Sequence, residues 1–405
     1  MWHTVLILSM HLSTYHQPQA TSIKKHHKEN SVWKSLRSQL EAWPYTEDFA
    51  VEVGNEKGRL FLFEKGNMTM NRKVMTASTS KWPIASMITA VVADGKIDSL
   101  DDKASKYLPW WTTDPKDSRS KVTLRMLLSF TSGFGGGAPG DKLTIESSVR
   151  GEDDDDGPKC MENVNGNFMK CARQIYEKVK LQGEPGKVFS YNSYHLQLAG
   201  AIAVAATKKN ITQILSHYLF KSFNMSSTDC MDGASNPPLA VCLKTTGKDY
   251  GNFLHRILAH KVIPKSITNE MEKDYTPVPV MPAGPTLFGH YCFGHFYECF
   301  DSELGFTEAC RKANIHSDPG AFGYYPLVDR SNGYYMQVVV EESGTFYNRS
   351  GIPEYIRLLA KPYVDLIMNG KDPSYADRSF AGKLTLEDVN YIHACYMNDP
   401  SCYYI

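Results

Sequence analysis

Strand-like segments lie near both ends of this chain and enclose a helical middle, and this order constrains the fold more than any other feature. Residues 49–66 alternate apolar and polar side chains on either side of a turn at residues 54–58, which predicts a β-hairpin. Strand-like runs return only at residues 287–300, 321–329 and 333–343. We therefore expect an α/β protein of the α+β type, with one mostly antiparallel sheet built from both ends of the chain and flanked by helices.

The helical patterns lie between these strands. From Ser80 to Ala93 apolar side chains recur at helical spacing, and Gly95 follows as a stop signal. Similar patterns cover residues 122–130, 194–207 and 211–223. The sequence thus predicts a mainly helical inserted region over about residues 100–260.

Length and composition suit one large domain. The chain has 405 residues, of which 42% are hydrophobic, enough for a substantial core. We expect a leader segment or first helix over residues 21–45, a domain over residues 46–368 and a tail over residues 369–405, stapled by Cys395 and Cys402. Basic and acidic residues balance at 44 each, so the charge predicts no nucleic-acid partner. No later run approaches the ~20 apolar residues of a membrane span.

Several features favour export. Residues 1–20 contain an apolar stretch and end on Ala20, which predicts a signal peptide although the usual basic start is missing. Local disulfides and glycosylation are typical of secreted proteins. Reduced thiols and unused sequons in a cytosolic protein remain the alternative. The closely spaced cysteine sets are Cys160/Cys171, Cys230/Cys242, Cys292/Cys299/Cys310 and Cys395/Cys402. The four glycosylation sequons begin at Asn67, Asn210, Asn224 and Asn348.

The sequence predicts no metal and no organic cofactor. Paired CxxC spacing, the usual mark of a zinc site, is missing. The acidic run at residues 152–156 lacks the alternating ligands of an EF-hand, so a solvated loop is expected there. Walker A and dinucleotide-binding glycine motifs in the right context are also missing.

Ser78 and Lys81 lie three residues apart at the start of the predicted helix over residues 80–93. A serine hydroxyl needs a nearby base to act as a nucleophile, and residues i and i+3 face the same side of a helix. The free N–H groups of a helix start also stabilise developing negative charge. By itself the pair has a second interpretation, in which Ser78 is only a helix cap.

The segment that contains Ser78 and Lys81 is the first of five that, taken in this order, resemble a known family. ASTSKW, GKIDSLDDKASKYLPWW, VTLRMLLSFTSGF, PGKVFSYNSYHLQLAG and HSDPGAFGYYPLVDRSNGYYMQ together resemble the serine β-lactamase/penicillin-binding-protein superfamily, especially its esterase-like class C branch, over roughly residues 45–345. The resemblance implies a β-lactamase/transpeptidase-like fold. It also implies that Ser78 is the acylated nucleophile and Lys81 its proton acceptor or electrostatic partner.

The resemblance assigns the second motif to Tyr191-Asn192-Ser193. Tyr191 would be the second base, with its phenol pKa lowered by the ammonium of Lys81. Without its context Tyr191 reads more readily as a buried aromatic. Ser193 replaces the usual asparagine and could donate one hydrogen bond to a substrate carbonyl.

The third motif allows two registers. His316-Ser317-Asp318 begins with the expected histidine but lacks the glycine, and it assigns the oxyanion-hole amide to Pro319, which has no N–H. Shifting the motif by two residues restores Gly320 and assigns the amide to Ala321. We prefer the second register, with the oxyanion held by the N–H groups of Ser78 and Ala321. His316 is then a neighbour of the substrate site or a structural residue.

The third motif also bears on the substrate. Asp318 would repel the carboxylate that a basic residue binds in the lactamase relatives, which argues against β-lactam hydrolysis as the main activity. An ester, a lipid-like acyl group or a neutral amide fits better. Trp82, Phe134, Tyr324 and Tyr325 could line an apolar acyl pocket or pack in the core.

These observations predict a secreted serine hydrolase that cleaves an ester or amide of a small-molecule or peptide acyl substrate through an acyl-enzyme on Ser78. A Gly-x-Ser-x-Gly elbow is missing, which argues against an α/β-hydrolase. The alternative is a catalytically silent extracellular binding module that uses the same cleft, because fold resemblance does not settle activity. Such a module would keep partner binding after Ser78→Ala. The oligomeric state does not follow from the sequence.

Overall fold

The computed structural model describes residues 31–44, 46–135, 159–276, 290–298, 308–340 and 346–376. The expected signal peptide, the acidic run and the Cys395/Cys402 pair lie outside these residues.

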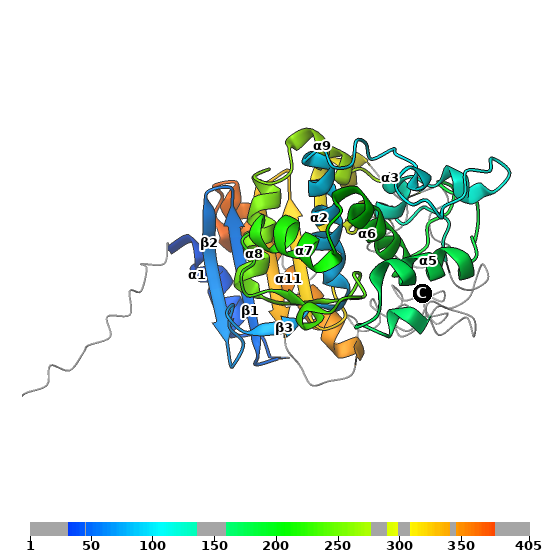
Figure 1. Cartoon of the computed structure of the whole chain (residues 1–405). Coiled ribbons are helices and arrows are strands. Elements are labelled where there is room, and N and C mark those ends of the chain that lie inside the picture. The colour runs from blue at the N-terminus through cyan, green and yellow to red at the C-terminus, as the bar shows by residue number, and fades with distance from the viewer. Residues whose placement is uncertain are drawn as a thin grey trace, which may run out of the picture.

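A seven-stranded antiparallel sheet with the strand order β2-β1-β10-β9-β8-β7-β6 forms the centre of the described structure (Figure 1). β1 from the start of the chain pairs with β10 from its end, which confirms a sheet built from both ends. A small second sheet has the order β3-β5-β4. The strands are β1 (Phe49–Asn55), β2 (Gly58–Lys65), β3 (Lys73–Met75), β4 (Asp229–Cys230), β5 (Leu243–Thr246), β6 (His290–Tyr291), β7 (Phe296–Tyr297), β8 (Ile315–Ser317), β9 (Tyr324–Asp329) and β10 (Tyr334–Val340).

The predicted hairpin is formed by β1 and β2. Its turn is closed by the Asn55 Oδ1, which accepts a hydrogen bond of 2.9 Å from the Lys57 backbone N–H. Gly58 follows with a φ of +130°, a conformation that favours glycine. The central strands β9 and β10 are buried at every position because helices cover both faces of the sheet.

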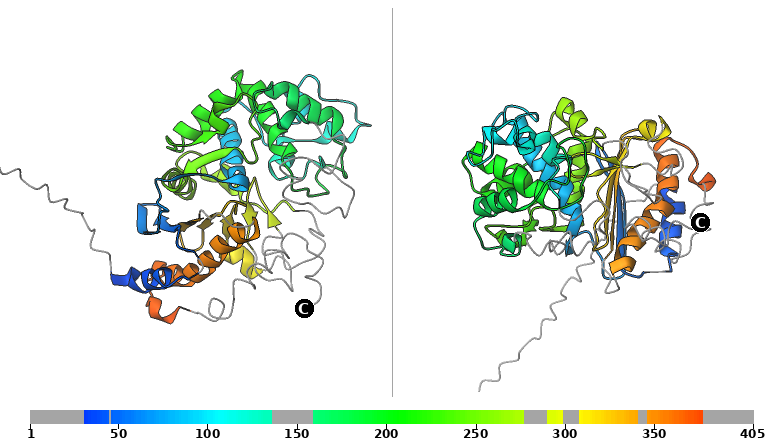
Figure 2. Two further views of the ribbon diagram at one scale, coloured as in Figure 1. Left: turned by 90° about the horizontal axis from the view of Figure 1, so that it is seen from below. Right: turned by 90° about the vertical axis from the view of Figure 1, so that its right-hand side faces the viewer.

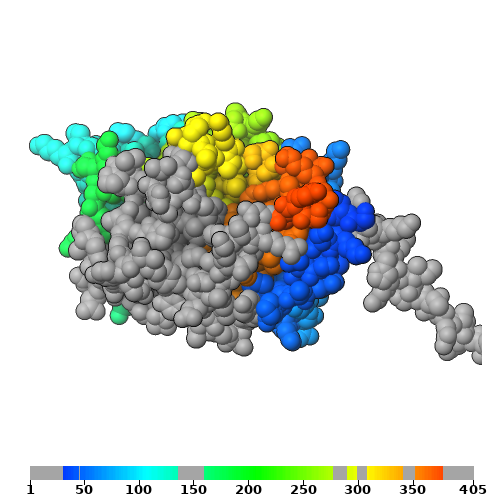
Figure 3. Space-filling model, turned by 180° about the vertical axis from the view of Figure 1, so that it is seen from behind, coloured from blue at the N-terminus to red at the C-terminus, as the bar shows by residue number. Residues whose placement is uncertain are grey.

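Helices cover the sheet on both sides (Figure 2). α1 and α11 lie together on one face, and α8 packs on the other face against β1, β9 and β10. Figure 3 shows the blue N-terminal segment beside the red end of the described chain, where α1 contacts α11 and the 3₁₀ turn η8 (Pro373–Tyr375). The helices are α1 (Lys34–Glu41), α2 (Lys81–Ala93), α3 (Leu124–Leu128), α5 (Phe168–Lys178), α6 (Tyr194–Thr207), α7 (Ile211–Ile214), α8 (Gly247–Leu258), α9 (Lys265–Met271), α10 (Glu308–Ala313) and α11 (Phe346–Met368).

The expected leader segment contains α1, which belongs to the folded body. Leu36 and Leu40 lie four residues apart on one face of this helix and are fully buried in the core. The segment therefore includes a first packed helix, one of the two alternatives that the sequence left open.

The helical layer is built around α2. α2 is apolar all round and is buried by its contacts with α6, α9 and the π-helix η6 (Leu215–Lys221). The predicted helix over residues 194–207 is α6, while the pattern over residues 211–223 divides into α7 and η6. The pattern over residues 122–130 forms only the short α3. No helix among the described residues is long and apolar enough to cross a membrane.

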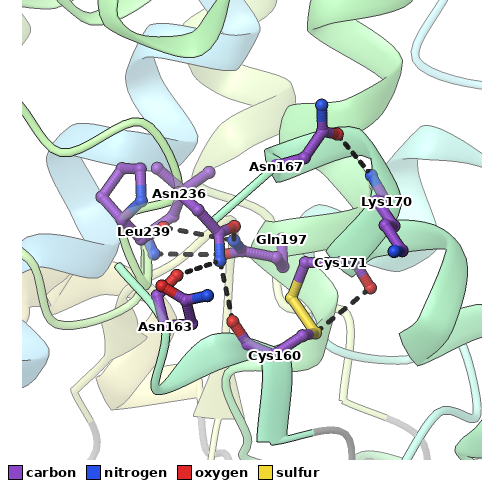
Figure 4. Close-up of a disulfide and its surroundings, with 9 residues drawn as sticks. Cys160, Asn163, Asn167, Lys170, Cys171, Gln197, Asn236 and Leu239 are labelled. Atoms are coloured by element: carbon purple, nitrogen blue, oxygen red, sulfur yellow. Dashed lines mark hydrogen bonds between the residues drawn. A yellow bond between two sulfur atoms is a disulfide. The ribbon is translucent and has the colours of Figure 1, made fainter. Parts of the chain in front are cut away.

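Two of the expected local cysteine pairs are disulfides. Cys160 bonds to Cys171 of α5, and Cys230 bonds to Cys242 beside β5. Figure 4 shows the Asn236 side chain donating hydrogen bonds to the carbonyls of Cys160 and Asn163 at 2.8 and 2.9 Å. The first bridge thus fastens the loop before α5 to the helical layer.

Candidate active site

Ser78 lies in the 3₁₀ turn η2 (Ala77–Ser80), which leads directly into α2. Ala77, immediately before it, has a φ of +48° in the left-handed region. This conformation is uncommon for a residue with a side chain and marks a sharp turn that presents Ser78 at the helix start. Ser78 is partly exposed, whereas Ala77, Thr79 and Ser80 are buried.

Two elements hold this turn in place through three hydrogen bonds. The Thr76 hydroxyl donates to the Leu243 carbonyl of β5, and the Leu243 N–H donates to Ser80 Oγ, both at 3.0 Å. The Tyr250 hydroxyl of α8 donates to the Thr79 carbonyl at 3.0 Å. Since these bonds come from sheet and helix, the position of Ser78 is fixed by the tertiary structure.

Lys81 and Ser78 are directly hydrogen-bonded. Lys81 Nζ lies 2.9 Å from Ser78 Oγ and 3.2 Å from the Ala240 carbonyl oxygen. The lysine is 2% exposed, and this burial lowers its pKa to about 8 although Asp318 acts in the opposite direction. A neutral amine at this position can accept the proton of the Ser78 hydroxyl.

Tyr191 completes the group. Its hydroxyl is hydrogen-bonded to Ser78, and Lys81 Nζ lies 4.7 Å from the centroid of its ring. The ring packs near Phe130 and Tyr291, with centroid distances of 5.9 Å to each. The structure thus brings Ser78, Lys81 and Tyr191 together.

The expectation of a lowered Tyr191 pKa is wrong. Burial raises the pKa of the Tyr191 phenol well above its usual value, and the hydrogen bond to Ser78 offsets only part of this effect. Burial disfavours the charged form of a phenol. Tyr191 is therefore a neutral hydroxyl that can donate a proton, whereas the sequence suggested a second base with a lowered pKa.

His195 of α6 positions the loop that carries Tyr191, and sequence reasoning missed it. Its Nε2 lies 2.8 Å from the Ser190 carbonyl, which can only accept, so Nε2 carries the hydrogen. Its Nδ1 then accepts from the Ser132 hydroxyl at 2.9 Å. The ring also stacks on Phe130 with centroids 4.8 Å apart. A histidine one turn after the motif, on an apolar helix, was the available signal.

The rest of the second motif is mainly structural. Asn192 Nδ2 donates to the Phe134 carbonyl at 2.9 Å, and its Oδ1 accepts from the Tyr194 N–H at 3.0 Å. Ser193 is the buried residue that precedes α6. Its contact with a substrate stays a prediction.

Gly320 lies directly against the nucleophile turn. A Cβ atom there would be 2.2 Å from the Thr76 carbonyl oxygen and 2.3 Å from Thr79 Oγ1, so only glycine fits. Ala321 follows it, is buried, and its N–H makes no hydrogen bond to another residue in the described part of the chain. This placement is compatible with the second register, in which Ala321 supplies an oxyanion-hole amide.

Asp318 is fully buried behind the site. Its Oδ2 accepts the Trp82 backbone N–H at 2.9 Å, and its Oδ1 has no hydrogen-bond partner among the residues that the structure describes. Burial raises the pKa of this carboxyl well above its usual value. A buried carboxyl with a raised pKa is a weak source of repulsion for a substrate carboxylate, so the expected repulsion loses its basis.

The aromatic residues proposed as an acyl pocket lie in the core. Trp82, Phe134, Tyr324 and Tyr325 are at most 1% exposed. His316 is also fully buried, and its Nδ1 lies 3.3 Å from Nε2 of His295. Contact of His316 with a substrate stays a prediction.

Known proteins resemble this chain in sequence and in fold. The sequence model named Beta-lactamase matches residues 52–360. A solved structure from Bacteroides dorei, named as a candidate beta-lactamase, is 25% identical and superposes with a TM-score of 0.63 over 83% of this chain and 99% of that one. The superposition confirms the predicted β-lactamase/transpeptidase-like fold.

Two curated relatives come from Staphylococcus aureus. Protein flp of strain MW2 is 26% identical over 182 residues, which is 43% of this chain and 33% of that protein. Teichoic acid D-alanine hydrolase is 26% identical over 230 residues, which is 53% of each chain. This chain therefore spans between a third and about half of the length of these relatives.

Proposed function

The chain belongs to the Beta-lactamase family, and on that premise we propose that it is a secreted serine hydrolase that cleaves an ester or amide through an acyl-enzyme on Ser78. One observation carries the proposal: Lys81 Nζ lies 2.9 Å from Ser78 Oγ, and the Tyr191 hydroxyl bonds to the same serine. A nucleophile held by both a base and a proton donor is the arrangement that covalent acyl transfer requires.

In the proposed acylation step, Ser78 Oγ attacks the substrate carbonyl carbon while its proton passes to the neutral amine of Lys81. The tetrahedral intermediate collapses when the bond to the leaving group breaks. Tyr191 gives its hydroxyl proton to the leaving oxygen or nitrogen and regains one from Lys81, which returns the lysine to its neutral form. Water then attacks the acyl carbonyl carbon while one of its protons replaces the Tyr191 hydroxyl proton, which passes to the neutral amine of Lys81. The bond between the acyl group and Ser78 Oγ breaks, Lys81 returns a proton to Ser78 Oγ, and the acid is released.

Negative charge on the carbonyl oxygen needs preorganised donors. We assign this role to the backbone N–H groups of Ser78 and Ala321. Support comes from Gly320, whose backbone lies so close to Thr76 and Thr79 that the next amide is held beside the nucleophile turn. An N–H that is fixed before the reaction costs no reorganisation when the charge develops.

For the substrate we propose an acyl ester or a neutral amide. One relative, at 26% identity, is named a teichoic acid D-alanine hydrolase, which supports an acyl substrate. Secretion is supported by the disulfides Cys160–Cys171 and Cys230–Cys242, since such bonds persist in oxidising compartments. The assembled trio favours this enzyme over the silent binding module, which has no need for a lysine with a lowered pKa.

The test is intact-protein mass spectrometry after exposure to a fluorophosphonate and to a nitrophenyl ester. We expect one covalent adduct on the wild type and none on Ser78→Ala. Ser331→Ala is the matched control. Ser331 lies in the turn that follows β9, at the opposite end of this strand from Tyr324. An unmodified wild type with no ester turnover, or equal labelling of Ser78→Ala, would overturn the proposal.

A further inference from the structure

Cys292, His295 and His316 form a second cluster of reactive side chains beneath α2. Cys292 and His295 lie in the turn between β6 and β7, and His316 lies on the neighbouring strand β8. All three are fully buried, and one ligand atom of each lies within 4.8 Å of the others. Thiol sulfur and imidazole nitrogen are the ligands of zinc and related ions.

The hydrogen bond of His295 fixes which nitrogen faces the cluster. Its Nδ1 lies 2.9 Å from the Phe293 carbonyl oxygen. Because a carbonyl oxygen only accepts, Nδ1 carries the hydrogen, and in the neutral ring Nε2 keeps a lone pair. That lone pair is directed at the ring of His316, since Nε2 lies 3.3 Å from the His316 Nδ1.

His316 is oriented in the same way from the other side. Its Nε2 lies 2.9 Å from Asn314 Oδ1 and 3.9 Å from a carboxylate oxygen of Glu272. Both oxygens accept hydrogen bonds, so Nε2 carries the hydrogen and Nδ1 keeps a lone pair. Imidazoles that bind metals are typically held like this, with the second N–H donated to a carbonyl or carboxylate.

Two lone-pair nitrogens therefore face each other in the interior, with the Cys292 sulfur 4.0 Å from one of them. Two lone-pair nitrogens form no hydrogen bond with each other, and the Cys292 thiol can donate its hydrogen to His316 Nδ1 only, which leaves His295 Nε2 as an acceptor without a donor from this cluster. A cation between them would satisfy both.

We propose that Cys292, His295 and His316 bind a metal ion that prefers thiolate and imidazole ligands, and that this ion is zinc. Two Zn–N bonds of ~2.0–2.1 Å at a tetrahedral angle place their nitrogens about 3.3 Å apart, which equals the observed separation of the two ring nitrogens. Binding replaces the thiol hydrogen of Cys292 with a sulfur–metal bond, and the proton leaves to solvent. Cys292 and His295 form a Cys-x-x-His pair, a spacing that differs from the CxxC pairs missing from this sequence.

A metal ion at this site would stabilise the first turn of α2, which carries Lys81. Gly294, between the two ligands, has a φ of +69°, and a Cβ there would lie 2.5 Å from the Lys81 carbonyl oxygen. The Trp82 indole stacks on His295 with ring centroids 4.5 Å apart. A metal ion would therefore fasten the β6–β7 turn and β8 under the first turn of α2.

The test is the metal content of the full chain, measured by inductively coupled plasma mass spectrometry after loading with zinc and removal of excess metal. We expect one zinc per chain in the wild type and a loss of at least tenfold in Cys292→Ala. Two control variants should keep the metal: His217→Ala, an exposed histidine of η6, and the double variant His26→Ala/His27→Ala, which removes a histidine pair that could bind metal adventitiously. Unchanged zinc content in Cys292→Ala would overturn the proposal.

A second measurement covers the case in which Cys292→Ala does not fold. Cobalt bound to the wild type should give a thiolate-to-cobalt charge-transfer band in the near ultraviolet. Folded wild type that binds no stoichiometric metal, or binds cobalt without this band, would overturn the proposal. Neither readout depends on ester turnover, so the metal site and the acyl-enzyme succeed or fail separately.

Discussion

Lys81 Nζ and Ser78 Oγ lie 2.9 Å apart at the first turn of α2, and burial lowers the pKa of this lysine to about 8. Below that pH the ammonium cannot accept the serine proton, and above it the neutral amine can. We therefore expect kcat/KM for a nitrophenyl ester to rise about tenfold per pH unit below about pH 8 and to level off above it. The rate with Ser78→Ala is subtracted at each pH. A flat profile would contradict Lys81 as the base.

Tyr191→Phe removes the proton donor and keeps the ring that packs near Phe130 and Tyr291. We expect kcat to fall by about 10²- to 10⁴-fold, the usual range for loss of a general acid or base. The unfolding midpoint should stay close to that of the wild type. Turnover within a few-fold of the wild type would show that Lys81 alone carries the proton transfers.

Gly320→Ala tests the close approach of the third motif to the nucleophile turn. The new Cβ would lie 2.2 Å from the Thr76 carbonyl oxygen, so the backbone must shift. We expect about 1 to 3 kcal/mol of lost stability from overpacking, measured by chemical denaturation, and at least tenfold lower kcat. Gly95→Ala is the control for activity: a Cβ there meets nothing within 4 Å, but the φ of +68° strains an alanine, so this variant should lose some stability and keep its kcat. Full activity in Gly320→Ala would show that this loop does not supply a donor of the oxyanion hole.

His195→Leu should act through Tyr191, which it positions without touching the reacting atoms. The change leaves the Ser190 carbonyl and the Ser132 hydroxyl without their partner, at a cost of about 1 to 3 kcal/mol. We expect kcat to fall more than KM rises, and His195→Gln to recover part of kcat because it keeps a donor and an acceptor. Equal loss of kcat in both variants would argue against positioning.

The two disulfides should differ in their effect on activity. Their sequence separations are 11 and 12 residues, so replacing either pair by serine should cost about 2 to 3 kcal/mol of stability on the loop-entropy model. Only Cys230→Ser/Cys242→Ser should also lower turnover, because Cys242 precedes Leu243, which holds Thr76 and Ser80. Equal turnover losses in the two double variants, measured below their unfolding transitions, would contradict this anchoring role.

Much of the architecture follows from local patterns. Alternation over residues 49–66 gave β1 and β2, and helical periodicity gave α2 and α6 close to their observed bounds. These elements could be predicted because their periodicity reflects which side of each element is buried. The pattern over residues 211–223 was less informative, because apolar residues spaced by four are compatible with both α-helical and π-helical turns.

The sequence by itself determined the order of the elements and the presence of Ser78, Lys81 and Tyr191 in motifs of a recognisable order. Only the tertiary structure decided the electrostatics: burial lowers the pKa of Lys81 and raises that of Tyr191, opposite to what a nearby ammonium alone suggests for the phenol. It also decided that Trp82 and His316 belong to the interior and that Cys292, His295 and His316 meet there. The reason is physical, because desolvation and contacts between distant segments depend on the packed surroundings of a side chain, which local sequence does not contain.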